Sequence, residues 1–156
     1  MNQIEQQFFG LLDMTHGVRD EAIATLGPED LSFRIEGCKS VGEVLQAMGD
    51  VESMYTRSFE TMKMDFTTQA PGRESIVSGQ AAVGWLHGLD GELKAALSAL
   101  SDDDLAKPID RGGWEMPAMA QFHTYREAVL ISFGKLDCYL RALGKSLPEE
   151  WVAWVG

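Results

Sequence analysis

Apolar side chains recur every three or four residues along most of the chain, which is the spacing of one face of an α-helix. Four such series cover residues 3–26, 40–63, 76–100 and 117–143. The second is the most regular, a continuous stripe formed by Val41, Val44, Leu45, Met48, Val51, Tyr55, Phe59 and Met62. The pattern therefore predicts four helices whose apolar faces share one core.

Local signals mark the ends of these helices. Gly27 and Pro28 end the first series, and Ser40 with Glu43 fits a capping box at the start of the second. Gly144 suits the left-handed residue that follows the fourth helix. We therefore expect an all-α, antiparallel four-helix bundle that forms a single domain over residues 1–156.

Long connections separate the predicted helices. Residues 27–39, 63–74 and 101–116 are rich in glycine, proline and polar side chains, so long connections are expected between helices 1-2, 2-3 and 3-4. Three apolar residues of the first connection should cover one end of the bundle: Leu31, Phe33 and Ile35. The tail 146–156, which carries Trp151 and Trp154, is expected to fold back as apolar cover.

Composition narrows the class of protein. The formal charge is −11, from 24 acidic and 13 basic residues, and no basic cluster is longer than a neighbouring pair. Nucleic acids and acidic membrane surfaces are therefore not expected partners, because both require concentrated lysine and arginine. No signal peptide begins the sequence, and Cys38 and Cys138 lack the spacing of a zinc site. We expect a cytoplasmic protein with reduced thiols, Cys138 filling the core.

Two charged residues interrupt the apolar stripes. Glu52 falls within the stripe of the second helix, whereas Asp50 projects to its opposite side, and Arg126 falls within the stripe of the fourth. A lone buried charge is severely unfavourable, so a buried Glu52–Arg126 pair is one prediction, with Gln121 and Tyr125 as neutral neighbours. The alternative is that both long side chains extend to the end of the bundle. His16, in the first helix, is interpreted as a packing residue.

Two segments resemble a known family. SVGEVLQAMGDVE, from Ser40 to Glu52, and YLRALG, from Tyr139 to Gly144, are similar to the second helix and the end of the fourth helix of the DinB-like superfamily. That superfamily includes YfiT-type metal-dependent hydrolases and thiol-dependent transferases. The resemblance implies a helical bundle with one divalent metal, bound by a histidine of the second helix and an H-x-x-x-H pair of the fourth.

The residues expected at those ligand positions differ from the family pattern. The second-helix histidine corresponds to Ala47, and the fourth-helix pair corresponds to Gln121 and Tyr125 or, in another register, to His123 and Glu127. A divalent metal such as zinc, nickel or manganese could still bind His123 and Glu127, with Asp50 or Glu52 as a further ligand.

Two functions remain open at this point. One is a small-molecule-binding or dimeric interaction protein without the three-histidine metal site, which the missing histidines favour. The other is a divalent-metal-dependent hydrolase or thiol-dependent transferase that acts on a small molecule. A homodimer is expected from the resemblance and from an apolar surplus in four tryptophans: Trp85, Trp114, Trp151 and Trp154.

Overall fold

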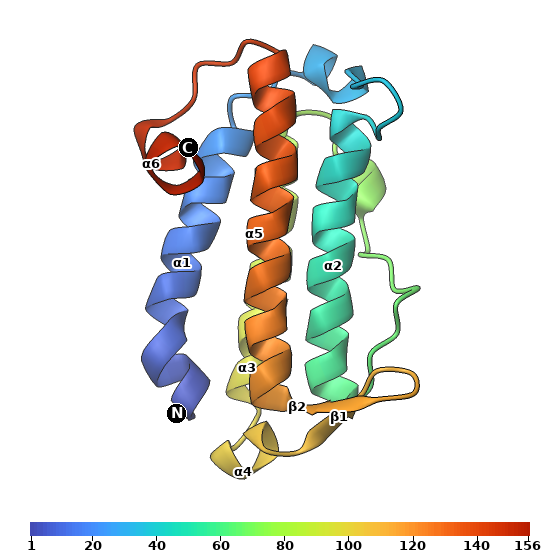
Figure 1. Cartoon of the computed structure of the whole chain (residues 1–156), viewed down its shortest axis with the longest axis vertical. Helices are drawn as coiled ribbons and strands as arrows, with labels where there is room; N and C mark the ends of the chain where they lie inside the picture. The colour runs from blue at the N-terminus through green and yellow to red at the C-terminus, as the bar shows by residue number, and fades with distance from the viewer.

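The computed structural model describes all 156 residues and contains four long helices packed side by side (Figure 1). They are α1 (Gln3–Ile23), α2 (Val41–Thr61), α3 (Gly79–Ser98) and α5 (Ala118–Ala142). The prediction of an all-α four-helix bundle is confirmed, and no predicted end differs from the observed one by more than three residues.

The predicted end signals act as expected. The Ser40 side chain accepts a hydrogen bond from the Glu43 amide, and the Glu43 carboxylate accepts one from the Ser40 amide, which completes the capping box of α2. Asn2 and Glu5 form a similar box at the start of α1. Gly144 adopts a φ of 68° after α5, a left-handed conformation that glycine reaches without strain.

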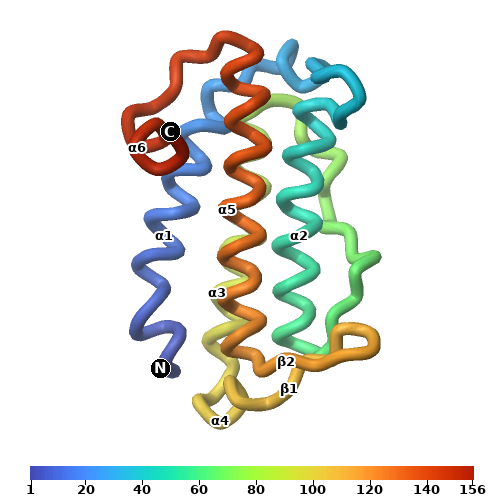
Figure 2. The backbone as a smooth tube through the Cα atoms, viewed as in Figure 1, coloured from blue at the N-terminus to red at the C-terminus, as the bar shows by residue number.

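The helix directions differ from a simple alternating bundle. Asn2, before α1, donates to the Leu97 carbonyl near the end of α3, so α1 and α3 are antiparallel. Gln121, early in α5, donates to Ser58 near the end of α2, so α2 and α5 are also antiparallel. The α2 and α3 helices, however, run in the same direction (Figure 2). The connection over residues 62–78 is long enough to return along α2, whose 21 residues span about 30 Å.

Short elements close both ends of the bundle. Two 3-10 turns, η1 (Pro28–Ser32) and η2 (Arg73–Ser75), lie in the first two connections. The third contains helix α4 (Asp102–Leu105) and a hairpin of strands β1 (Pro108–Asp110) and β2 (Glu115–Pro117), which periodicity did not predict. The chain ends in helix α6 (Glu149–Val155).

The covering segments pack against the core as predicted, except that Trp154 is 37% exposed. Leu31, Phe33 and Ile35 lie against the core at one end, and Trp151 of α6 is completely buried there. Cys138 is exposed, so its prediction as core filling was wrong. It lies two residues after the buried Leu136 and two before the buried Leu140, a spacing that turns it away from the core.

The bundle holds two apolar cores along its length. One is built from the end of α1, the starts of α2 and α3 and the end of α5, together with Trp151. The other is built from the opposite halves of the same helices. Three charged residues and a histidine are buried along the helices between the two cores: Arg19, Glu52, Asp90 and His16. This buried polar layer is the main departure from an apolar interior.

None of the helices combines the length and the hydropathy that a membrane span requires.

Candidate functional site

Arg19 of α1 is the centre of the polar layer. Its side chain is only 2% exposed and forms a two-pronged pair with Asp90 of α3, with N–O distances of 3.1 and 2.8 Å. The Nε atom donates to Asp20 at 2.8 Å, and Nη1 lies 3.5 Å from Glu52 of α2. One guanidinium therefore faces three carboxyl groups from three helices.

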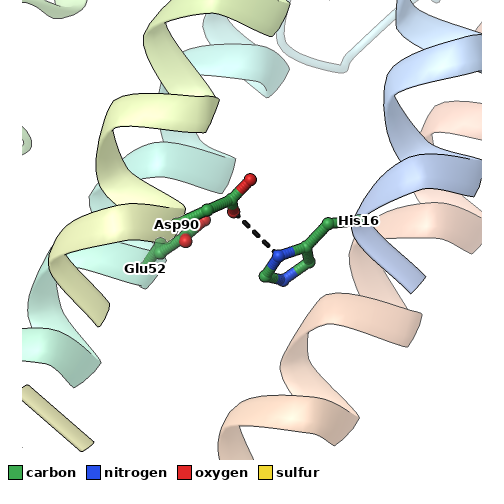
Figure 3. Close-up of side chains that lie close together, drawn as sticks. All are labelled: His16, Glu52 and Asp90. Carbon is green, nitrogen blue, oxygen red and sulfur yellow. Dashed lines mark ion pairs between the residues drawn. The ribbon is translucent and has the colours of Figure 1, made fainter. Parts of the chain in front are cut away.

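His16 extends the layer to α5. Its Nδ1 lies 2.9 Å from Asp90 and its Nε2 lies 3.0 Å from the Tyr125 hydroxyl. Figure 3 shows the imidazole turned toward Asp90, with Glu52 beside that carboxyl group. If Nδ1 donates to the carboxylate, Nε2 is left to accept the Tyr125 proton. Both ring nitrogens are thus already bonded.

The two buried carboxyl groups have pKa values that are shifted in opposite directions. Burial, followed by the negative charge of Asp90, raises the pKa of Glu52 well above its ordinary value of 4.5. Burial also opposes ionisation of Asp90, but hydrogen bonds from His16 and Arg19 outweigh it and hold the pKa of Asp90 far below its usual range. The raised pKa favours the protonated form of Glu52, whose buried Oε1 atom has no hydrogen-bond partner.

The predicted partner of Glu52 was wrong. Glu52 is buried as expected, but Arg126 is only partly buried and lies over the Phe8 ring, 5.1 Å from its centre. The α5 helix turns Gln121, Phe122 and Tyr125 inward, which leaves Arg126 at the edge of the bundle. The cation that lies beside Glu52 is Arg19 of α1 and not Arg126. The signal for it was present, because Arg19 lies between the core residues Val18 and Ala22 of α1.

Gln121 and Tyr125 bond to different neighbours. Tyr125 belongs to the polar layer through His16. Gln121 accepts from Arg111 at 2.6 Å and donates to Ser58 at 2.9 Å, toward the end of the bundle that carries the hairpin. Tyr55 of α2 packs on Tyr125 at 5.5 Å between ring centres. The α2 residues beside this pair are thus Tyr55 and Ser58, two or three turns beyond Ala47.

The other candidate metal ligands do not converge. His123 packs against Phe8 at 5.3 Å, and Glu127 is exposed. Asp50 accepts from the Ala70 amide at 2.8 Å and pairs with Arg73 at 3.2 Å, so it anchors the 62–78 connection. Two other groups do place their donor atoms within 4.8 Å of one another: His16, Glu52 and Asp90, and Asp20, His87 and Asp90.

A sequence model of the DinB superfamily matches residues 11–132, which is most of the chain. The chain belongs to the DinB superfamily. Its fold is similar to a DinB-like protein of Bacillus subtilis, YjoA, with a TM-score of 0.73 and 16% identity over 96% of this chain and 98% of that one. A DinB-like protein of Bacillus cereus gives a TM-score of 0.73 with 18% identity over 95% and 98%. A comparison with curated proteins finds no significant match.

The interior of this DinB-like bundle does not fit a divalent metal. Gln121 and Tyr125 offer an amide and a neutral phenol, since complete burial raises the pKa of Tyr125 well above its ordinary value of 10.0. In the neighbouring group, both nitrogens of His16 are bonded, the pKa of Glu52 is raised by burial, and the Arg19 guanidinium already pairs with the carboxylates. A metal bound there by His16 and Glu52 would have to break a hydrogen bond of His16 and compete with Arg19 for the Glu52 carboxyl group.

An open hollow lies beside α2 at the hairpin end of the bundle. It measures about 970 Å³ and is lined by Arg57 and Thr61 of α2 and by residues 63–69. Met64 belongs to the lining of the hollow, and its sulfur accepts a hydrogen bond at 3.1 Å from the side-chain amide of the buried Gln121. This contact joins the hollow to the interior of the bundle. Phe66 forms an exposed edge of the hollow, and Arg111 stacks between this ring and Trp114 at 5.5 and 4.8 Å. We call this surface the α2 hollow.

Removal of Arg19 should destabilise the fold strongly. Arg19→Ala leaves Asp90 and Asp20 without their buried counterion, so the free energy of unfolding should fall by about 3–5 kcal/mol in urea denaturation. Arg126→Ala is the matched control and should cost less than about 1 kcal/mol, because that side chain only covers Phe8 at the bundle edge. Equal losses in the two variants would mean that Arg19 does not organise the layer.

The protonated state of Glu52 predicts a pH-dependent stability difference. Below its ordinary pKa of 4.5, Glu52 carries a proton in both the folded and the unfolded chain. As the pH rises, the unfolded chain releases this proton while the folded chain keeps it, which lowers wild-type stability by up to about 1.4 kcal/mol per pH unit until the folded pKa is passed. The amide of Glu52→Gln has no proton to release in this pH range, so the stability of the variant does not fall with pH for this reason.

The difference is measured by urea unfolding of Glu52→Gln and wild type at several pH values. The variant should become increasingly the more stable of the two as the pH rises above 4.5, the ordinary pKa of Glu52. Glu127→Gln, at an exposed position of α5, should show no such trend. A difference that stays constant with pH would show that Glu52 is ionised in the fold.

Proposed function

We propose that this DinB-like protein is a small-molecule-binding protein that works without a metal in the bundle interior. Its ligand is a small organic anion with an apolar or aromatic part, and the α2 hollow is its site. The observation that carries the proposal is the presence in that hollow of two cations that form no ion pair, Arg57 and Lys63, within a chain whose net charge is −11.

The charges around the hollow support an anionic ligand. Neither Arg57 nor Lys63 forms an ion pair, although acids outnumber bases 24 to 13. The carboxylate in the lining, Asp65, is bound instead by the Thr67 amide and hydroxyl at 2.9 and 2.6 Å. A carboxylate or phosphate ligand would supply the missing counter-charge and accept charge-assisted hydrogen bonds from both cations.

Phe66 of the lining, with Arg111 and Trp114 next to it outside the lining, favours an organic ligand over a bare ion. Phe66 is 58% exposed and Trp114 is 53% exposed, with the Arg111 guanidinium held between their rings. Exposed aromatic rings beside fixed cations suit a ligand that has both an anionic group and a flat or apolar portion. The side-chain amide of Gln69 in the lining offers a further hydrogen-bond donor, whereas the threonine hydroxyls already donate within the protein.

The alternative is a divalent-metal-dependent hydrolase or a thiol-dependent transferase. The interior donor set argues against a metal at the family position, because Ala47, the Gln121 amide and the Tyr125 phenol replace the imidazoles that such chemistry needs. The binding function requires only the hollow and is therefore preferred.

Ligand binding can be tested with benzoate and inorganic phosphate as probes, titrated by isothermal calorimetry and by chemical-shift changes. Benzoate should bind more tightly than phosphate because it also contacts Phe66. The Arg57→Ala/Lys63→Ala double variant should lose at least about tenfold in benzoate affinity, since each charged hydrogen bond contributes about 1.5–3 kcal/mol.

The matched control is Lys135→Ala, which removes a lysine from the exposed face of α5 away from the hollow. Its benzoate affinity should equal that of the wild type. Failure of benzoate to bind the wild type, or equal affinity in the double variant, would refute the proposed site.

We also propose that the chain forms a homodimer through the side built by α1, α5 and α6. The structure uses Trp151 internally and ties Trp85 to the Pro71 carbonyl, so these two do not serve a partner. Large apolar side chains remain exposed on α5 and α6, namely Leu130, Ile131, Val152 and Trp154. Leu130 and Trp154 line one crevice with Leu11 of α1, which gives a second copy a continuous apolar surface.

Light scattering at micromolar protein concentration tests the dimer. The wild type should have twice the mass of one chain, and Leu130→Glu should be a monomer because a buried carboxylate would lack a partner. Val77→Glu places the same charge on another exposed apolar residue, outside the proposed interface, and should remain dimeric. A monomeric wild type would exclude the dimer.

A further inference from the structure

We infer that the outer edge of the polar layer, between α1 and α3, is a binding site for a divalent transition metal, with Asp20, His87 and Asp90 as ligands. This site goes beyond the proposed small-molecule function. It also differs in place from the metal position that the family resemblance implies, which lies between the second and fourth helices of the bundle. We call it the α1–α3 site.

The geometry brings three good donors together. His87 and Asp90 are three residues apart on α3, so they share a face of that helix, and Asp20 reaches them from the antiparallel α1. Donor atoms of all three residues lie within 4.8 Å of one another. The His87 Nε2 and the Asp20 Oδ2 are 2.7 Å apart, so a metal ion that replaced the shared proton would bind both after a small separation.

Arg19 orients both carboxylates. Its Nε holds Oδ1 of Asp20 at 2.8 Å and its Nη2 holds Oδ2 of Asp90 at 2.8 Å. Each of these oxygens has a second lone pair, and Oδ2 of Asp20 faces His87. Arginine therefore acts here as an outer-shell partner that fixes ligand direction, as hydrogen-bonded partners do around metal sites.

The α1–α3 site differs from the buried polar layer in which histidine it contains and in how far that histidine is exposed to water. His16 uses both ring nitrogens, whereas His87 is 61% exposed and contacts only Asp20. Protonated Glu52 is not among the donors of the α1–α3 site. Two carboxyl groups, those of Asp20 and Asp90, share one guanidinium, so the site has more acidic than basic groups to offer a divalent cation.

The surface leaves room to complete the coordination shell. A depression of about 350 Å³ opens over the site, lined by polar residues and by Gly17 and Gly91. No atom lies within 4 Å of where a Cβ would stand on either glycine, so water can reach the donors. Lys94, the nearest basic residue on the rim, pairs with Asp13 and leaves the site carboxylates free.

The donor set selects the class of metal. One imidazole and two carboxylates, with open positions for water, suit Zn²⁺, Co²⁺, Ni²⁺ or Mn²⁺. Magnesium and calcium prefer oxygen ligands alone and should bind more weakly. The site would link α1 to α3 at the level of the polar layer and so add to the stability of the loaded protein.

The test uses Zn²⁺ and Co²⁺ as probes on full-length protein first treated with a chelator. Calorimetry should give one Zn²⁺ per chain, and Co²⁺ should give visible absorption bands typical of four or five ligands. His87→Ala and His87→Gln should each weaken Zn²⁺ binding by at least about tenfold and abolish the metal-dependent rise in melting temperature. Both substitutions are at an exposed side chain and should fold, which circular dichroism checks.

His123→Ala is the matched control, because His123 is the other histidine of the chain outside the buried layer. It should bind Zn²⁺ within about twofold of wild type. The Arg57→Ala/Lys63→Ala variant should also bind normally, which separates this site from the α2 hollow. The inference is overturned if wild type binds no Zn²⁺, if the His87 variants bind it fully, or if His123→Ala abolishes binding.

Discussion

The ion pair between Arg19 and Asp90 is the interaction on which the middle of this bundle depends. Both groups lie between two apolar cores, where an unpaired charge would be strongly destabilising. The pair joins α1 to α3, and its neighbours extend the connection to α2 through Glu52 and to α5 through His16 and Tyr125. All four long helices are thereby held at one level by directional contacts, which apolar packing alone does not provide.

The Arg19 guanidinium cannot support the same chemistry as a bound metal ion. Both neutralise buried carboxylates, but arginine cannot dissociate, offers no open coordination position and cannot polarise a substrate atom in the way of a metal ion. The interior of this DinB-like protein is therefore suited to structural organisation, and its accessible chemistry lies at the surface. The proposed α2 hollow presents cations and aromatic rings, whereas the proposed α1–α3 site presents carboxylates and an imidazole. The second shares Asp20 and Asp90 with the polar layer, so Arg19 serves both the fold and that site.

The polar layer could be predicted in part. Glu52 was identifiable as buried because it interrupts a regular apolar stripe, and the same reasoning applied to α3 would have found Asp90, which follows Leu86 and precedes Leu93 on one face. Arg126 satisfied the pattern but is at the edge of the bundle, because a stripe defines a helix face only to within about one residue. A polar residue within an apolar stripe therefore indicates a buried side chain that needs a hydrogen-bonding or charged partner. The stripe does not identify that partner.

The sequence by itself determined the four helices, their caps, the covering segments and the burial of Glu52, because these follow from spacing within a few residues. Only the tertiary structure decided that α2 and α3 are parallel, that Arg19 is the counterion, and that Asp20, His87 and Asp90 meet. Asp20 and Asp90 are seventy positions apart. Their approach depends on which helices become neighbours and how each is rotated about its axis. The choice of neighbouring helices and the rotation of each helix depend on side-chain packing throughout the core and on the long connections. No short segment of the sequence encodes either of them.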